Sequence, residues 1–157
     1  LGDGIFDMPQ WRGHGGAWGV GSDSHACVNA AEELLMLEYS QRLSLRQRNV
    51  LAGPDPQVGT ALWTAAVQGG AQAAGRPVAG LAVGQQADFL ALDADHVALA
   101  GLPVQAMVSA HVFGIHRSSA LHSLWVGGER RVQAGRHALH EAAARGFVAA
   151  RAATLQS

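Results

Sequence analysis

The chain has 157 residues, the length of one ordinary domain, and 48% of them are hydrophobic, which is enough for a buried core. Only 15% are charged, the formal net charge is -1 and Lys and Arg form no basic stripe, so the composition gives no case for a nucleic-acid partner. No apolar run approaches the ~20 residues needed to span a bilayer, so no membrane partner is expected, and the single Cys27 favours a reducing, cytoplasmic location.

In chain order, the first predicted elements are a loop and a short strand. Residues 1–16 are rich in Gly and polar side chains, which is typical of a loop. Their opening, LGDGIF, has no Met and no basic leader and is typical of the middle of a gene. Residues 17–21 form an apolar run that predicts a buried strand, and this run ends at the Ser-Asp-Ser-His sequence of residues 22–25.

Two helices are predicted next. Asn29 is a suitable N-cap, because a Glu follows three residues later in the capping-box pattern. The first helix carries a stripe formed by Leu34, Leu37, Gln41 and Leu45. It should end before Gly53, and a second helix should begin at Asp55-Pro56, with Asp as N-cap. Gly75 is expected to stop the second helix.

After residue 80 the sequence pattern changes from helical segments to short apolar runs. Short apolar runs predict strands at residues 88–93, 107–113, 121–126 and 130–133. Gly127-Gly128 is expected to make the turn between the last two strands, and residues 140–155 have helical composition. These strands predict a small β-layer followed by a terminal helix.

Asp23 is the main candidate for a catalytic residue. It follows the predicted strand at its carboxyl end, where parallel α/β barrels place their catalytic groups. A carboxylate there can ligate a divalent metal ion and accept a proton from metal-bound water, whose pKa the metal lowers. In an equally simple alternative, Asp23 or Ser24 only caps the next helix. The residues alone leave both interpretations open.

The other reactive side chains give weaker hypotheses. His25 can contact a substrate or a neighbouring group, although a lone histidine is more typical of a polar loop. Cys27 has no His–Asp pair placed around it and is expected to be a small buried residue, not a nucleophile. Glu32, Glu33 and Glu38 are expected to complement the helix dipole and carry surface charge. The sequence contains no His-x-His pair and no nucleotide-binding glycine motif.

Several motifs match one known enzyme family. They are the opening LGDGIF, GVGSDSH at residues 19–25, EELLMLEYSQRL at residues 32–43, and residues 125–128 and 135–137. Residues 80–93 follow the pattern G-x-x-x-G-x-x-A-D-h-x-x-h-D, where h is hydrophobic, which is common to the amidohydrolase superfamily. Together these motifs resemble the formimidoylglutamate deiminases.

The resemblance implies a reaction and a metal ion. Relatives have a (β/α)8 barrel with one catalytic zinc, held by histidines of other strands and by the Asp of the last strand, which corresponds to Asp23. Asp23 would therefore be a zinc ligand and a proton shuttle, and Ser24 and His25 would lie close enough to line the substrate pocket. The implied reaction converts N-formimino-L-glutamate to N-formyl-L-glutamate and ammonia, a step in histidine degradation.

The resemblance also implies that the chain is a fragment, because a complete barrel takes about 250 residues. We expect an α/β fold: the carboxy-terminal part of a (β/α)8 metal-dependent hydrolase barrel plus strands of a small composite β-sandwich domain. The expected divisions are residues 1–78 for the end of the barrel, 79–138 for the β-sandwich segment and 139–157 for a carboxy-terminal helix. The remaining zinc ligands are expected outside the chain, so the fragment alone should be inactive.

Two alternatives stay open. The chain could come from a related amidohydrolase that acts on another amidine, a purine, a pyrimidine or a triazine. It could also be a non-catalytic interaction module that keeps the carboxy-terminal β-layer. The expected partner is a small-molecule substrate, and a homodimer is one expectation for the complete protein.

Overall fold

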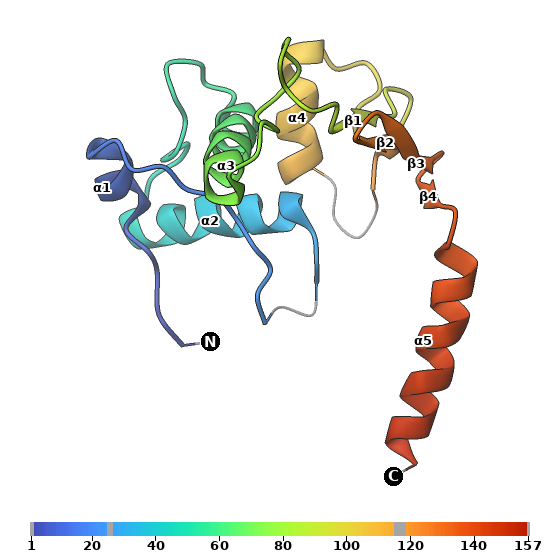
Figure 1. Cartoon of the computed structure of the whole chain (residues 1–157). Helices are drawn as coiled ribbons and strands as arrows, with labels where there is room; N and C mark the ends of the chain where they lie inside the picture. Colours follow the sequence, from blue (N-terminus) through green and yellow to red (C-terminus); the bar gives the residue numbers. More distant parts are fainter. Residues whose placement is uncertain (1, 25–26, 115–118, 157) are drawn as a thin grey trace.

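The computed structural model describes residues 2–24, 27–114 and 119–156. Figure 1 shows a helical part beside a small sheet, with the last helix extending away from both. The elements are α1 (Met8–Gly13), α2 (Ala30–Leu45), α3 (Val58–Ala74), β1 (Phe89–Leu92), α4 (Val104–Phe113), β2 (Leu121–Val126), β3 (Glu129–Gln133), β4 (Arg136–His137) and α5 (His140–Leu155). No helix of this described chain is long and apolar enough to cross a membrane.

Residues 1–16 are not a continuous loop, because they contain the short helix α1. Asp7 Oδ1 accepts a hydrogen bond from Gln10 N at 3.0 Å, and Pro9 lies in the first turn. A carboxylate cap followed by Pro is a usual start of a helix, so the sequence did carry this information. Met8, at the start of α1, is almost fully buried and anchors the segment in the core.

The predicted start of α2 is confirmed. Asn29 Oδ1 accepts a hydrogen bond from Ala31 N at 3.0 Å, and the helix ends at Arg46, which has a left-handed φ of 56°. The buried face consists of Ala31, Leu34, Glu38 and Gln41. Leu45 is 46% exposed, so the predicted stripe was wrong at its carboxyl end.

Glu38 is fully buried, which contradicts its expected place on the surface. Its Oε1 accepts hydrogen bonds from Arg42 Nε at 2.6 Å and from Val50 N at 3.1 Å. Its Oε2 accepts a hydrogen bond from Leu51 N at 2.9 Å. A buried carboxylate is stable only with such donors, so Glu38 fixes the chain after α2 against the helix. Because it pairs with the buried Glu38, Arg42 is itself partly buried, and 28% of its side chain is exposed.

α3 begins later than the sequence predicted and stops where it predicted. Asp55 Oδ1 accepts a hydrogen bond from Gln57 N at 2.8 Å, so Asp55 forms a turn before the helix and is not its N-cap. The stop at Gly75, with φ 61°, is confirmed. At buried Gly59 a Cβ would lie 2.5 Å from Ser109 Cα, so this glycine allows α3 and α4 to approach closely.

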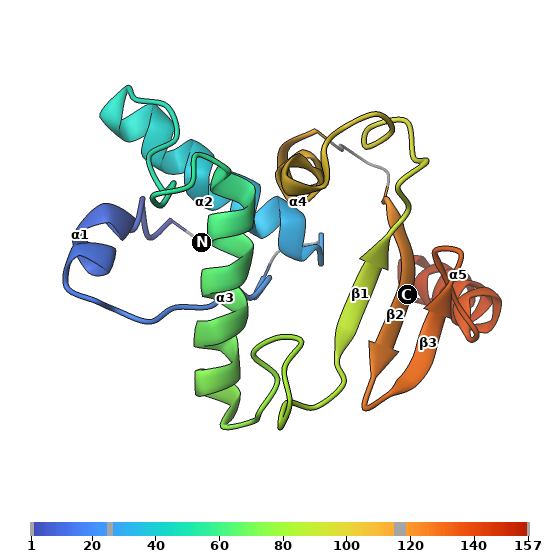
Figure 2. The ribbon, with the colours of Figure 1, turned by 90° about the horizontal axis from the view of Figure 1, so that it is seen from above.

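The core of the helical part lies between α1, α2, α3 and α4 (Figure 2). It consists of Met8, Ala31, Leu34, Leu51, Val58, Leu62 and Val112. α4 was expected to be a strand at residues 107–113. Its apolar run is too short to be assigned by periodicity alone, and packing against α2 and α3 stabilises the helix.

The strands predicted near residues 88–93, 121–126 and 130–133 are confirmed as β1, β2 and β3 of an antiparallel sheet of order β1-β2-β3-β4. Gly127 and Gly128 form the β2–β3 turn with φ values of 60° and 81°, which glycine adopts without strain. Asp88 Oδ1 accepts hydrogen bonds from Gly127 N at 2.6 Å and Gln86 Nε2 at 2.8 Å, and these bonds lower the pKa of Asp88 below its usual value. The Asp of the superfamily pattern therefore has a structural role, which is to hold this hairpin against β1.

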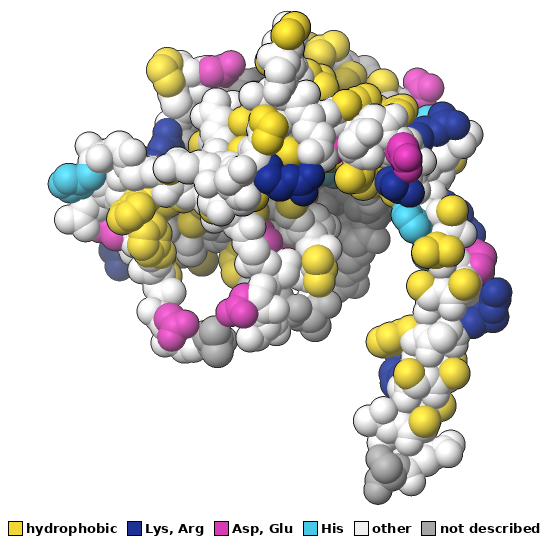
Figure 3. All heavy atoms as spheres, viewed as in Figure 1, with side chains coloured by type: hydrophobic (Ala, Val, Ile, Leu, Met, Phe, Trp, Pro, Cys, Tyr) yellow, Lys and Arg dark blue, Asp and Glu magenta, His cyan; other side chains and the backbone are white. Residues whose placement is uncertain are grey.

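α5 occupies the predicted residues and projects from the rest of the chain (Figure 3). In this described element no residue is buried, and Phe147 is 63% exposed. The projecting helix carries apolar side chains along much of its length (Figure 3).

Candidate functional site

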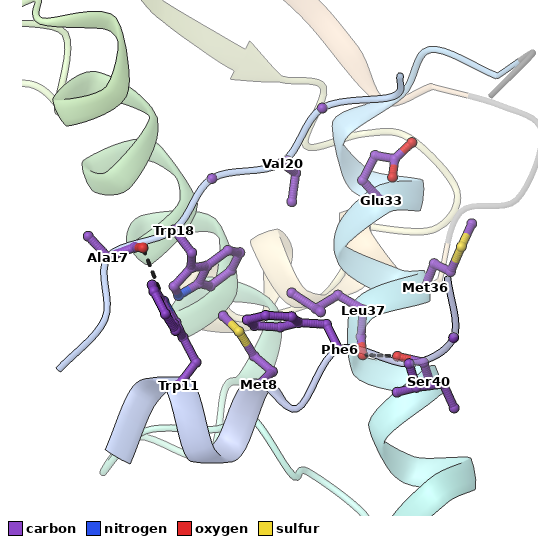
Figure 4. A pocket seen from close by; sticks show the side chains of 14 residues that line it. Phe6, Met8, Trp11, Ala17, Trp18, Val20, Glu33, Met36, Leu37 and Ser40 are labelled. Carbon is purple, nitrogen blue, oxygen red and sulfur yellow. Dashed lines mark hydrogen bonds between the residues drawn. The ribbon is translucent and has the colours of Figure 1, made fainter. Parts of the chain in front are cut away.

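A cavity of about 620 Å³ lies beside the segment that leads to Asp23. Its walls are the residues before and within α1, residues 17–21, and one face of α2. Figure 4 shows the side chains of Phe6, Met8, Trp18 and Leu37 gathered in this cavity. Most of the lining is apolar, and Glu33 supplies the one carboxylate among the lining residues.

Residues 17–21 are extended but form no strand in the described chain, contrary to the expectation. A strand needs a neighbouring strand to pair its backbone groups, and the described residues place none beside this segment. Other contacts hold the segment instead. Trp11 Nε1 donates a hydrogen bond to Ala17 O at 3.1 Å, and the Trp18 side chain packs against the helical core (Figure 4).

Asp23 lies just beyond this segment, exposed and in a left-handed conformation with φ 42°. Among the described residues no hydrogen bond or ion pair joins its carboxylate to a partner. Asn29 caps α2, so the alternative in which Asp23 or Ser24 caps that helix was wrong. Ser24 is exposed next to Asp23, whereas His25 lies outside the described residues. The roles of these side chains stay predictions.

The donor set does not complete a metal site within the part of the chain that the structure describes. No group of three or more His, Cys, Asp or Glu side chains converges there. Asp23 offers a single carboxylate, which cannot by itself hold a catalytic zinc. The described residues therefore supply one candidate ligand, Asp23, to the implied metal ion and no complete ligand set.

Cys27 is exposed, so the expectation of a buried cysteine was wrong. Its Sγ donates a hydrogen bond to Glu32 Oε2 at 2.8 Å. This bond to a carboxylate is the main reason that the pKa of Cys27 is raised above its usual value. The raised pKa favours the thiol form over the thiolate, and the expectation that Cys27 is not a nucleophile stays a prediction.

Two residues that shape this site had no role assigned to them from the sequence, although Gln41 was placed on the stripe of the first predicted helix. Gln41 Nε2 donates a hydrogen bond to Phe6 O at 2.8 Å, and Arg12 Nη1 donates one to Leu51 O at 2.5 Å. These bonds fasten the residues around α1 to α2 and to the chain that follows it. Leu34, Glu38 and Gln41 are spaced so that they share the buried face of α2. This spacing was the signal in the sequence that could have identified Glu38 and Gln41 as buried polar residues.

Comparison with solved structures defines the class of protein. The fold superposes on an amidohydrolase from Brucella melitensis with a TM-score of 0.88 and 39% identity, covering 99% of this chain and 34% of that one. An atrazine chlorohydrolase from Arthrobacter aurescens complexed with zinc has a TM-score of 0.70 at 22% identity, covering 88% of this chain and 30% of its own. A triazine hydrolase variant has a TM-score of 0.76 at 22% identity, covering 95% of this chain and 32% of its own. The last two similarities concern the fold alone.

Within the amidohydrolases the relationship is more particular. The chain is 44% identical over 149 residues to formimidoylglutamate deiminase from Pseudomonas aeruginosa, which covers 94% of this chain and 33% of the relative. No protein-family model matches. The chain is therefore a homologue of this hydrolytic deiminase and spans about a third of the length of the relatives that it matches. The resemblance found in the sequence is confirmed, as is a fold of helices and antiparallel strands that agrees with the carboxy-terminal part of an amidohydrolase barrel plus a β domain.

Proposed function

We propose that this chain is the carboxy-terminal third of an enzyme that hydrolyses N-formimino-L-glutamate to N-formyl-L-glutamate and ammonia in histidine degradation. The observation that carries the proposal is the identity of 44% with formimidoylglutamate deiminase over 94% of the chain. The complete enzyme, meaning this chain with the preceding part that its gene would encode, is the active species.

Asp23 is the residue of this chain that takes part in the chemistry. Water adds to the formimino carbon, and the Asp23 carboxylate accepts a proton from that water. This proton passes to the formimino nitrogen, and the second proton of the water, on the hydroxyl group of the adduct, follows it as the bond between the carbon and this nitrogen breaks. The nitrogen leaves as ammonia, and the carbon keeps the water oxygen as the carbonyl oxygen of the formyl group. The exposure of the Asp23 carboxylate supports this role, because a group that exchanges protons with a substrate must be accessible to it.

Zinc is the cofactor that we propose for the complete enzyme, and a bound zinc ion lowers the pKa of a coordinated water. The support is indirect: the structurally similar atrazine chlorohydrolase is complexed with zinc, and Asp23 leaves a carboxylate available. We place the other zinc ligands in the preceding part of the enzyme, since the described residues bring together no group of three or more His, Cys, Asp or Glu side chains. The groups that bind the substrate carboxylates are placed there as well.

Substrate preference tests the proposal. The complete enzyme, supplied with zinc, should release ammonia from N-formimino-L-glutamate with a higher kcat/KM than from adenosine, guanine or cytosine. Ammonia release is measured for each compound under the same conditions. A purine or pyrimidine as the better substrate would limit the assignment to the amidohydrolase superfamily.

The preceding sequence separates the remaining alternatives. A His-x-His pair there supports an enzyme, because such a pair supplies two metal ligands on one strand. Its absence from the complete gene supports the non-catalytic interaction module. The triazine hydrolases share the fold at 22% identity, which favours no triazine substrate over the deiminase reaction.

A further inference from the structure

The segment that leads to Asp23 crosses α3 in direct backbone contact. The contact point on the helix is Gly69, which is buried. A Cβ on Gly69 would lie 1.9 Å from Trp18 O, 2.5 Å from Trp18 C and 2.7 Å from Trp18 N. Real Cβ atoms essentially never approach other atoms closer than 3.0 Å, so any side chain at Gly69 must displace the Trp18 backbone.

The same segment is held from its other sides. Trp11 Nε1 bonds to Ala17 O, and the indole of Trp18 packs into the helical core, so the segment cannot simply slide away (Figure 4). A Cβ on Gly19 would lie 3.3 Å from Cα and N of Gly70, which shows that the segment also lies close to the helix one residue further on. Contacts with Trp11, with the helical core and with α3 therefore fix the position of residues 17–19, and α3 limits it on one side.

Two consecutive glycines in the middle of a helix are unfavourable by about 1 kcal/mol each relative to alanine, so a packing reason is expected. The structure separates the two. A Cβ on Gly70 would meet no atom within 4 Å, whereas one on Gly69 would collide with the backbone of Trp18. Of the two glycines, only Gly69 must lack a side chain for residues 17–19 to lie against α3.

We propose that Gly69 is a positioning residue that sets where the Asp23 carboxylate lies, an inference that rests on the proposed role of Asp23. A Cβ at Gly69 would have to push the Trp18 carbonyl outward by about 1.5 Å, the difference between 1.9 Å and an ordinary contact of 3.4 Å. Only residues 20–22 separate this contact from Asp23, which has a left-handed φ of 42°, so we expect a displacement of the Trp18 backbone to move the Asp23 carboxylate. A misplacement of about 1 Å at a reacting group can lower turnover by ~10²-fold.

Three glycine variants of the complete enzyme test the proposal. Gly69→Ala should lower kcat by ~10²-fold and leave KM nearly unchanged, because a reacting group moves while the groups that bind the substrate carboxylates do not. Gly19→Ala, with a contact of 3.3 Å, should have a smaller effect. Gly70→Ala makes the same chemical change on the same helix and should keep the wild-type kcat. Circular dichroism and the elution volume check that each variant is folded.

A folded Gly69→Ala variant with the kcat of Gly70→Ala overturns the proposal. If Gly69→Ala does not fold, Gly19→Ala decides: a kcat below that of Gly70→Ala supports the proposal, and an equal kcat overturns it. If the wild-type enzyme releases no ammonia, the proposed function fails separately, and crystal structures decide the positioning role. Asp23 displaced together with the Trp18 carbonyl in Gly69→Ala then supports it, and Asp23 in the wild-type position overturns it.

Discussion

Asp23 combines an exposed carboxylate with a backbone conformation that suits few residues. Its φ of 42° lies in the left-handed region, which Asp and Asn adopt more readily than other non-glycine residues. The substitution of Asp23 by Asn therefore preserves both the shape of the side chain and the turn, while removing the negative charge. This makes the variant a clean test of the chemistry.

Asp23→Asn in the complete enzyme should lower kcat by several orders of magnitude. A positioned proton-transfer group alone contributes ~10²–10⁴-fold, and loss of a metal-ligating charge adds to that effect. Steady-state release of ammonia measures the change. Asp55→Asn, the same substitution in an exposed turn, is the control and should stay active. Near-normal turnover of Asp23→Asn would remove Asp23 from the mechanism.

Cys27 should react slowly with thiol reagents although it is exposed. The hydrogen bond to Glu32 raises the pKa of the thiol, so little thiolate is present near pH 8. Glu32→Gln removes the negative charge and should increase the rate at which iodoacetamide alkylates Cys27. Mass spectrometry at several pH values measures this rate. An unchanged rate in Glu32→Gln would show that the bond does not control the thiol.

Single residues with a local conformational task could be predicted from the sequence. The Asn29 cap, the Gly75 stop and the turn at residues 127–128 depend on side chains or φ angles within a few residues. Glu38 could not be predicted in the same way, because its donors at residues 50–51 come from a loop folded back on the helix. The position of Asp23 in a turn directly after an apolar run also depends on neighbouring residues alone, and the structure has Asp23 in such a turn.

At the scale of elements, Glu38 connects α2 to the chain after it. Glu38→Gln should lower the free energy of unfolding by about 3 kcal/mol, because one amide group of Gln would face N–H donors where the carboxylate accepted bonds. Urea unfolding of the complete enzyme measures the loss. Glu141→Gln is the control: Glu141 lies on the exposed α5 and pairs with Arg136 of β4, and the loss of this ion pair should change the free energy of unfolding by less than about 1 kcal/mol. Equal effects of the two substitutions would contradict the buried role of Glu38.

The sequence assigned α4 and residues 17–21 wrongly, for different physical reasons. α4 has an apolar run that suits a strand, but Pro103 precedes it and the helices α2 and α3 receive its buried side. Residues 17–21 have the composition of a buried strand and lack a strand to pair with in the described chain. Tertiary partners decide both cases, and a sequence pattern does not contain them.

At the scale of the whole molecule, the family motifs predicted more than the local patterns did. The relationship to the deiminase and the general architecture follow from motifs spread over the chain, and both are confirmed. The arrangement around the cavity did not follow, because it depends on contacts between α1, α2, α3 and residues 17–21. These contacts join residues far apart in sequence, such as Trp18 with Gly69. The division of the chain at residues 78 and 138 stays a prediction.

The last prediction concerns the 157-residue chain by itself, which should be inactive and bind zinc poorly. Asp23 cannot complete a catalytic zinc site, and no group of three or more metal-ligating side chains converges elsewhere in the described chain. We also expect association, although not through the predicted leucine stripe, since Leu34 is buried. The exposed apolar side chains around the cavity are Ile5, Phe6, Trp11, Val20 and Met36.

Such a patch on an isolated chain favours self-association or binding to the missing part of the enzyme. The chain should be purified alone, and its bound zinc, ammonia release and sedimentation measured. Supplying the preceding part of the enzyme in trans should shift the chain into a mixed complex and restore zinc binding, whereas Asp23→Asn in the same experiment should assemble without restoring turnover. A monomeric chain that holds zinc stoichiometrically and releases ammonia from N-formimino-L-glutamate would show that these residues need no missing part, and the fragment interpretation would be wrong.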